Sequence, residues 1–245
     1  MTFGSGHSST VPSADKDRHY FDSDEMELTV TPDHEQIHLG EPLMLTWTLT
    51  NKSGAPIPAP TDIRIEALYS YITVTDPNGV LRPMPTFTIE CESAKIANLG
   101  PGKSLTAQTR VFWSSRGFAF ERSGRHAIEV HVMWAITGVP FGAKGRTDVW
   151  VNFPQSDADN NAAATLLHPE VGVYVALGGG EHLTEAVSRL NEVSSGAATG
   201  DSRVKGPAAS ALRGYAGLLP ANGRDAGKTG AKARAKPRRP SKKTR

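Results

Sequence analysis

Hydrophobic and polar residues alternate along much of the stretch from residue 26 to residue 154. The clearest run covers residues 43–50, in which three leucines and Trp47 alternate with Met44 and three threonines. Successive side chains of a β-strand point to opposite faces, so this run predicts a strand with one buried face. Turn-forming residues at positions 51–54 end the predicted strand.

The same alternation recurs in short segments on both sides of this run. It predicts further strands at residues 27–31, 36–39, 63–68, 71–75, 80–81, 87–89, 104–113, 125–134 and 147–153. Residues 138–145 are expected to form a loop, because glycines and a proline interrupt the pattern there. No helical period separates the strands, so we predict a mainly β protein with an antiparallel β-sandwich of about 7–9 strands.

The pattern changes after Pro154. Ser156 can cap a helix that runs to Leu167, and residues 182–193 carry apolar side chains at helical spacing. A third, weaker helical pattern places four side chains on one side, those of Ala211, Leu212, Tyr215 and Leu219. These patterns predict a small α-helical segment after the sandwich.

Composition divides the chain into four parts. Hydrophobic residues make up only 38% of the sequence, and 24 glycines and 17 prolines indicate that part of the chain is not packed. We expect a disordered N-terminal segment (1–25), the sandwich (26–154), the helical segment (155–220) and a disordered basic tail (221–245).

Three short motifs carry a resemblance to a known family. They are Gly40-Glu41-Pro42-Leu43 before Trp47, Leu99-Gly100-Pro101-Gly102 before a strand, and the run from Phe118 to Arg125 before the next strand. Their order resembles that of bacterial immunoglobulin-like modules, such as CARDB-like domains and the BsuPI-type proteinase-inhibitor sandwich. His126 stands where such domains usually have a tyrosine. The resemblance implies an immunoglobulin-like sandwich over roughly half of the chain, but turn motifs imply no activity.

The net charge of +2 hides an uneven distribution. Ten of the 27 Lys and Arg residues lie at positions 224–245 beside the single acid Asp225, which leaves 17 basic and 24 acidic residues elsewhere. A basic tail interrupted by Gly, Ala and Pro can bind phosphate backbones or other polyanions without sequence preference. The candidate polyanion-binding residues are Lys228, Lys232, Arg234, Lys236, Arg238, Arg239, Lys242, Lys243 and Arg245.

Cysteine content and the apolar segments bear on location. One cysteine is present, so the chain can form no internal disulfide bond. No apolar run has the length of a membrane-spanning helix, and residues 1–17 lack the apolar core of a signal peptide. These features favour a cytoplasmic protein.

No catalytic, cofactor-binding or metal-binding pattern stands out in the sequence. Residues 97–104 match a relaxed phosphate-binding loop, but a strand is predicted after them, and phosphate binding requires a helix there. His34 and His38 do not converge at strand spacing, and the glutamates on both sides of Cys91 disfavour a thiolate. Since no Gly-x-Ser-x-Gly motif occurs either, we predict a protein that is not an enzyme and needs no cofactor or metal.

Aromatic residues of the later strands are candidates for contact with a partner protein, because aromatic side chains often dominate interfaces. They are Phe118, Phe120 and Trp150. The expected contact surfaces are the edge strand near residues 83–89 and the loops at residues 114–123 and 138–146.

The sequence therefore predicts a non-enzymatic protein-binding or assembly module. Two alternatives stay open: a nucleic-acid-associated or polyanion-associated protein that binds through its tail, and a proteinase inhibitor that acts through a protruding loop. An enzyme would require clustered carboxylates or histidines in a cleft where the sandwich meets the helices.

Overall fold

A computed structural model describes residues 21–22, 25–86, 89, 95–180 and 182–198. Its strands are β1 (Phe21–Asp22), β2 (Met26–Pro32), β3 (Gln36–His38), β4 (Leu43–Asn51), β5 (Ile57–Pro60), β6 (Ser70–Thr75), β7 (Leu81–Pro83), β8 (Ile96–Leu99), β9 (Ser104–Val111), β10 (Trp113–Ser114), β11 (Gly117–Phe118), β12 (Gly124–Ile136) and β13 (Val139–Asn152). Its helices are η1 (Ile65–Ala67), α1 (Asp157–Leu166), α2 (Pro169–Ala176) and α3 (Thr184–Ala198). The predicted third helical pattern and Cys91 lie outside the described residues.

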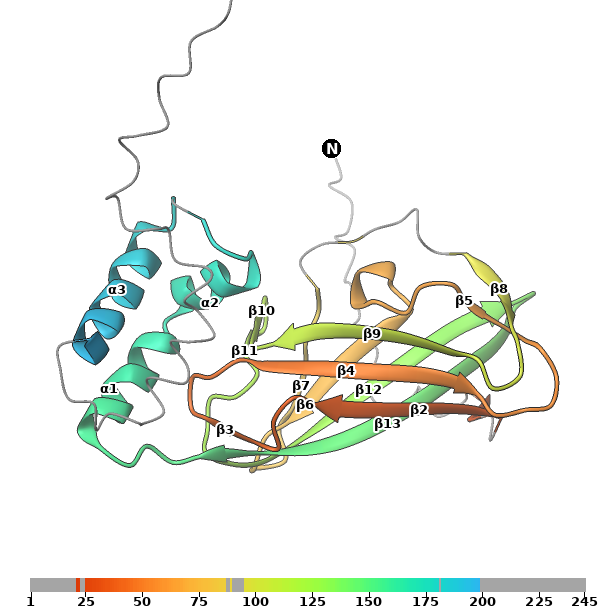
Figure 1. The fold of residues 1–245 in the computed structure, drawn as a ribbon, viewed down its shortest axis with the longest axis horizontal. Helices are drawn as coiled ribbons and strands as arrows, with labels where there is room; N and C mark the ends of the chain where they lie inside the picture. The colour runs from red at the N-terminus through yellow and green to blue at the C-terminus, as the bar shows by residue number, and fades with distance from the viewer. Residues whose placement is uncertain (1–20, 23–24, 87–88, 90–94, 181, 199–245) are drawn as a thin grey trace, which may run out of the picture.

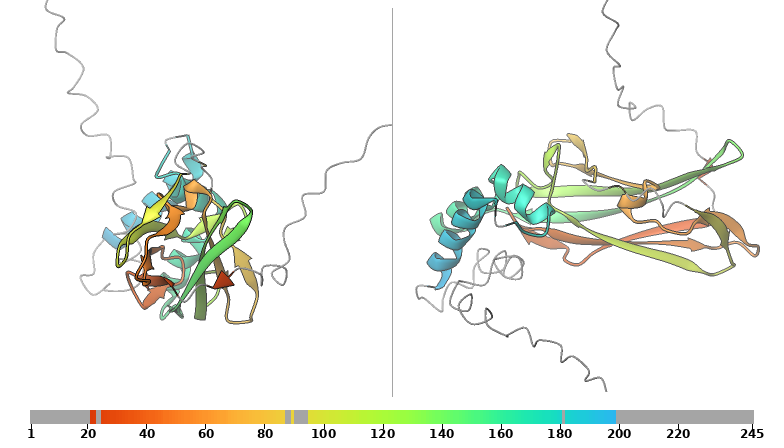
Figure 2. Two further views of the ribbon diagram at one scale, coloured as in Figure 1. Left: turned by 90° about the vertical axis from the view of Figure 1, so that its right-hand side faces the viewer. Right: turned by 90° about the horizontal axis from the view of Figure 1, so that it is seen from above.

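Two sheets form the two layers of the body. One has the strand order β2-β4-β9, and the other has the order β1-β13-β12-β6-β7, with β3 also paired to β13. The sheets face each other, and the three α-helices lie together at one end (Figures 1 and 2). This arrangement confirms the predicted mainly β sandwich followed by a small helical segment. The strands outnumber the expected about 7–9 because several have only two or three residues, too few for an alternating pattern to show.

Two segments differ from their predictions. Residues 63–68 contain the 3-10 helix η1, which ends at Leu68 in the left-handed conformation with φ of 65°. Residues 138–145 are not a loop, because β12 and β13 form one long antiparallel hairpin that pairs Ile136 with Val139. Positive φ angles at Thr137 and Gly138 give the tight two-residue turn that such a hairpin requires.

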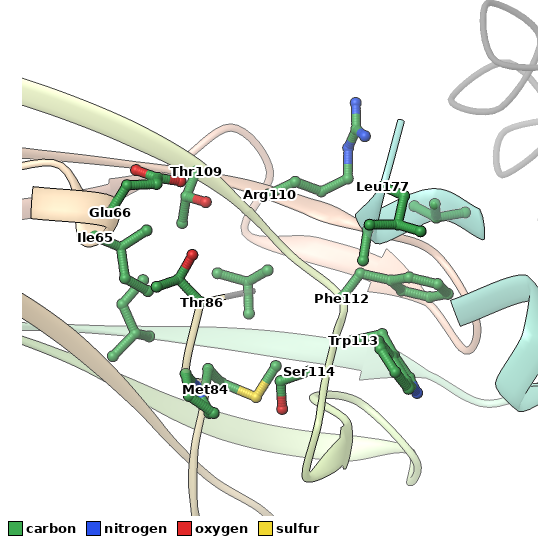
Figure 3. Close-up of a pocket in the computed structure, with 15 residues that line it drawn as sticks. Ile65, Glu66, Met84, Thr86, Thr109, Arg110, Phe112, Trp113, Ser114 and Leu177 are labelled. Atoms are coloured by element: carbon green, nitrogen blue, oxygen red, sulfur yellow. The ribbon is translucent and has the colours of Figure 1, made fainter. Parts of the chain in front are cut away.

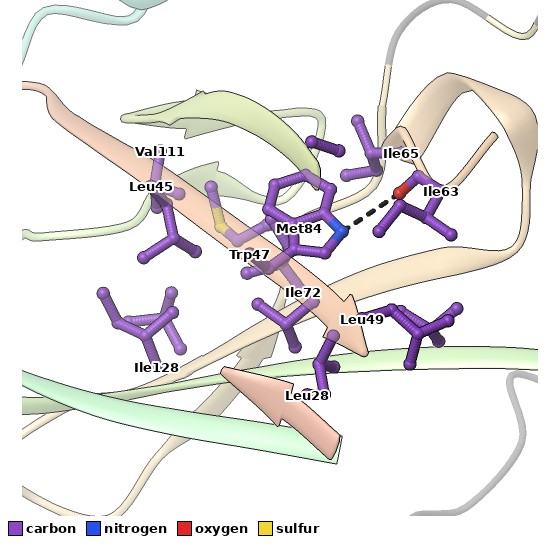
Figure 4. Close-up of a cluster of buried hydrophobic side chains, with 14 of the residues drawn as sticks. Leu28, Leu45, Trp47, Leu49, Ile63, Ile65, Ile72, Met84, Val111 and Ile128 are labelled. Carbon is purple, nitrogen blue, oxygen red and sulfur yellow. Dashed lines mark hydrogen bonds between the residues drawn. The ribbon is translucent and has the colours of Figure 1, made fainter. Parts of the chain in front are cut away.

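A single core fills the space between the two sheets. Trp47 is fully buried at its centre, and its indole N–H donates to the carbonyl oxygen of Ile63 over 3.0 Å (Figure 4). The same carbonyl accepts a hydrogen bond from the Ser70 hydroxyl over 2.6 Å. The largest aromatic side chain of the core therefore holds the connection between β5 and β6 in place, with its polar atom satisfied.

The helical segment packs against one end of the sandwich. Ser156 caps α1 as predicted, because its hydroxyl oxygen accepts from the Asp159 N–H over 3.1 Å. A second buried cluster joins the helices to the end of β9 and the strands β10 and β11; its members are Phe112, Phe118, Leu166, Val171, Tyr174, Val175, Ala186 and Leu190. None of the helices in the described part of the chain is long and apolar enough to cross a membrane.

Two glycines set the close approach between helices and sandwich. Gly40 is buried in a turn with φ of 86°, and a Cβ there would lie 2.9 Å from the Leu166 Cβ of α1. Gly172 lies within α2, and a Cβ there would overlap the indole ring of Trp113. The backbone of α2 therefore lies directly on the face of Trp113.

We expect Gly172→Ala to lower the free energy of unfolding by about 1–3 kcal/mol, because the added methyl group forces Trp113 out of its place. The same change in a Trp113→Ala background should instead be neutral, or stabilising by up to about 1 kcal/mol through helix propensity. Urea denaturation of the four proteins of this double-mutant cycle measures the coupling. Equal penalties in both backgrounds would contradict the described packing of α2 on Trp113.

Candidate functional site

The two sheets are in close contact along one side of the sandwich, and a pocket opens along the other side. On one side β13 lies against β2, where a Cβ at Gly145 would overlap the backbone of Leu28. On the other side the outer strands are β9 and β7, which pair only with β4 and β6 among the described strands. A pocket of about 240 Å³ opens on this second side, where it meets the helices (Figure 3).

The floor of the pocket is continuous with the sandwich core. Ile72 of β6, Met84 just after β7 and Val111 of β9 are almost fully buried and come from both sheets. Burial of such side chains fixes the floor, because moving any of them would open a cavity in the core. The floor therefore offers a preformed apolar surface.

The rim of the pocket is polar. It carries Glu66 from η1, Thr86 from the chain after β7, and Thr109 and Arg110 from the end of β9. Thr109 points into the space between the sheets, whereas Arg110 projects outward from the opposite face of β9 (Figure 3). The alternation of one strand thus supplies an inner polar group and an outer positive charge.

The last turn of α2 closes one end of the pocket. Val175 is buried there, and Leu177, just beyond the helix, is 52% exposed. The contact of Gly172 with Trp113 sets how close this turn lies to β9. The helical segment therefore supplies one wall of the pocket, and the sandwich supplies the rest of its lining.

The lining offers little for acid–base or nucleophilic chemistry. Glu66 is the single carboxylate among the described residues that line the pocket, and no histidine lines it. The hydroxyl of Ser114 is buried and accepts a hydrogen bond from the Arg116 N–H over 3.1 Å, so a local turn already uses it. The arrangement can bind a group with an apolar body, but the described side chains do not form a nucleophile–base pair.

The predicted aromatic contact residues are not brought together. Phe118 and Phe120 are buried, packing edge-to-face against Phe112 and His126 with ring centroids 5.2 and 5.3 Å apart. They stabilise the interior and offer no surface to a partner, in contrast to the expectation from the sequence. Trp150 is 45% exposed on β13 and does not line the pocket.

Two of the three predicted contact segments contribute to the pocket lining, and the third does not. Three residues of the 83–89 edge, Met84, Pro85 and Thr86, line the pocket. The 114–123 segment contains β11 and contributes Ser114 to the lining. Residues 139–146 belong to strand β13, and Gly138 lies in the tight turn before it, so this segment does not provide the expected loop.

Sequence reasoning missed the pocket itself, because its residues come from five separate stretches. One signal was present: Thr109 falls on the inner face of its strand, where the neighbouring inner positions are Leu105, Ala107 and Val111. A polar residue in that series indicates that the inner face is partly open to solvent near the end of β9. The candidate polyanion-binding residues of the tail lie outside the described residues.

The described histidines do not form a metal site. No three His, Cys, Asp or Glu side chains converge as potential ligands in the described part of the chain. His126 and His131, five residues apart, face opposite sides of β12: His126 is fully buried, and His131 stacks on Tyr71 with ring centroids 4.5 Å apart.

The His126 imidazole is a buried titratable group of the core. Its Nδ1 lies 3.2 Å from the Gly124 carbonyl oxygen, and no described atom hydrogen-bonds its buried Nε2. Burial lowers the pKa of His126, and the nearby charge of Arg82 lowers it further, against the opposing effects of the Gly124 carbonyl and Asp76. The ring is therefore held neutral inside the fold.

This shift predicts a loss of stability in mild acid. With a folded pKa below the ordinary value of 6.5, the unfolded chain takes up a proton before the folded chain does. The contribution of neutral His126 to the free energy of unfolding is fully present above pH 6.5. It falls as the pH drops below this value, by up to about 1.4 kcal/mol per pH unit. Urea denaturation between pH 7 and 5 should show this fall in the wild type, reduced in His126→Leu and retained in the exposed-site control His34→Leu. A wild type whose stability falls no faster than that of His126→Leu would refute it.

Comparisons with known proteins give only a distant likeness. No protein-family model and no curated protein matches the sequence. Among solved structures, the CARDB domain of the PF1109 protein from Pyrococcus furiosus, in complex with di-metal ions, is 13% identical with a TM-score of 0.29, over 54% of this chain and 96% of that one. The sporulation control protein Spo0M from Bacillus subtilis is 9% identical with a TM-score of 0.35, over 58% of this chain and 54% of its own.

An enzyme appears among the similar structures as well. The alkylpurine DNA glycosylase AlkC from Pseudomonas fluorescens, bound to DNA with an abasic site analog, is 16% identical with a TM-score of 0.31. This chain covers 31% of the glycosylase, and the match covers 53% of this chain. Likenesses at this level carry no argument about activity, so what the comparisons show is a weak architectural resemblance to modules that include the immunoglobulin-like CARDB domain.

Proposed function

We propose that this chain is a non-enzymatic protein-binding or assembly module. In this proposal the pocket between the sandwich and α2 receives an apolar side chain of the partner. The observation that carries the proposal is the pocket of about 240 Å³ with an apolar floor, beside an edge of β9 that no described strand pairs with. Pockets for small ligands usually measure about 300–1,000 Å³, so this one suits a single side chain better than a free ligand. A large apolar side chain buried in a partner's pocket is the usual anchor of a protein interface.

The chemistry of the lining supports a binding role. Its polar groups lie at the rim, where they can accept or donate hydrogen bonds to a partner's backbone. A catalytic site would need acid, base or nucleophilic groups positioned together. The charged side chains of the described lining are Glu66 and Arg110, and they point in different directions (Figure 3). This arrangement supports the proposed non-enzymatic role.

Filling the pocket should abolish partner binding. Thr109→Trp places an indole in the pocket, whereas Thr106→Trp makes the same change on the exposed face of the same strand. In a pull-down from a lysate of the source organism, the partner retained by the wild type should also be retained by Thr106→Trp and be lost from Thr109→Trp. Retention by a folded Thr109→Trp variant would place the partner-binding surface elsewhere.

The charge of the tail favours a second candidate function, association with nucleic acid or another polyanion. Ten Lys and Arg residues at positions 224–245 would bind phosphates through release of counterions. A chain ending at Pro220, compared with the full chain at about 50 and 300 mM salt, distinguishes the two functions. Nucleic acid captured only by the full chain at low salt supports the tail, whereas a protein partner that survives both changes supports the pocket.

The proteinase-inhibitor alternative would use a different element. The tip of the β12–β13 hairpin exposes Val139 to 46%, and it would be the protruding segment in that case. A protease inhibited by the full chain, and unaffected by Thr109→Trp, would favour this alternative.

A further inference from the structure

The outer edge of β9 presents backbone groups that none of the described strands pairs with. The Asn51 N–H donates to the Lys103 carbonyl over 3.0 Å, whereas the Met44 carbonyl accepts from the Asp33 N–H over 2.9 Å on the β2 side. Backbone groups in an antiparallel ladder alternate between the two neighbours. The odd-numbered residues of β4 therefore bond to β9, and on β9 the partners of those bonds are Leu105, Ala107, Thr109 and Val111.

It follows that the intervening residues of β9 direct their N–H and C=O groups away from β4. These residues are Ser104, Thr106, Gln108 and Arg110. No backbone hydrogen bond reaches them from the described residues on that side. An unpaired strand edge of this kind is a template for an added strand.

The pocket lies beside the last part of this free edge. Thr109, Arg110 and Val111 belong both to β9 and to the pocket lining. A residue of an added strand that lies opposite Thr109 or Val111 would point to the same face as they do, into the pocket. Its two neighbours along that strand would point outward, on the face that carries Gln108 and Arg110.

The charges of Arg110 and Glu66 favour particular residues in an added strand. Arg110 is exposed on the outer face, and no ion pair is found for it within the described residues. Glu66 lies at the pocket rim and would repel an acidic side chain that enters the pocket. An acidic residue is therefore favoured outside, opposite Arg110, and an apolar residue inside.

We infer that the partner adds an extended segment to the edge of β9, with an apolar residue in the pocket and an adjacent acidic residue against Arg110. This inference rests on the proposed function and names the partner's chemistry: a strand in which acidic and apolar residues alternate. A second copy of β9 does not fit, because the strand contains no acidic residue and would bring its own Arg110 to the same face.

Peptides displayed on phage test the inference with the full chain. Random heptapeptides selected on the wild type should carry an apolar residue with Asp or Glu beside it. Thr109→Trp should abolish their binding. Arg110→Glu should lower the affinity for the selected peptides roughly tenfold. Peptides that carry Lys in place of the acidic residue should regain affinity for the Arg110→Glu variant. Arg116→Glu changes the net charge equally outside the pocket lining, and it should leave affinity unchanged.

Backbone pairing is tested separately. Gln108→Pro removes only an outward N–H, which an edge strand tolerates, and it should weaken peptide binding roughly tenfold relative to Gln108→Ala. If Gln108→Pro lowers the melting temperature strongly, N-methylation of each peptide position in turn gives the same information. Loss of binding at every second position is expected, since alternate N–H groups face β9.

The outcomes separate the two proposals. Peptides that depend on Thr109 but not on Gln108, Arg110 or alternate N–H groups would refute strand addition and leave the pocket as a binding site. Absence of any peptide sensitive to Thr109→Trp would refute the pocket and the strand together. Selected peptides with the predicted pattern and the predicted sensitivities would establish both.

Discussion

The hydrogen bond between the Trp47 indole and the Ile63 carbonyl organises this structure. Trp47 is the largest fully buried side chain of the core, and burying its N–H without an acceptor would cost about 1–3 kcal/mol. The acceptor belongs to the connection between β5 and β6. The central strand β4 of one sheet therefore holds in place the segment that leads into β6 of the other sheet. Because η1 begins two residues after Ile63, the same bond also helps to position Glu66 at the pocket rim.

The two sides of the sandwich are closed by different means, and this difference creates the site. On the β2 side the sheets come so close that residue 145 must lack a side chain. On the β9 side the outer strands β9 and β7 do not pair with each other, and the end of α2 lines one end of the pocket. The result is a pocket next to a strand edge that no other described strand pairs with. The proposed binding surface thus combines an apolar pocket with backbone groups that no described strand pairs with.

The helical segment belongs to the same unit as the sandwich. Its cluster includes Phe112 and Phe118 from the sandwich end, and Gly172 allows α2 to lie on Trp113. Short helices of this kind gain stability from packing more than from their own propensity. The pocket, which α2 helps to form, therefore depends on a tertiary contact between parts of the chain that the sequence pattern separates.

Strong local signals along the chain specify three features of the fold: the alternation around Trp47, the cap at Ser156, and the change from strands to helices after Pro154. Local periodicity and capping act over a few residues, so they can be read along the chain. Tertiary structure decided the rest. Residues 139–145 form a strand because β12 pairs with them, and Phe118 and Phe120 belong to the core because the helices and His126 cover them. The pocket also escaped prediction, since it is formed by stretches whose proximity depends on how the two sheets and α2 pack, and no local pattern encodes that distance.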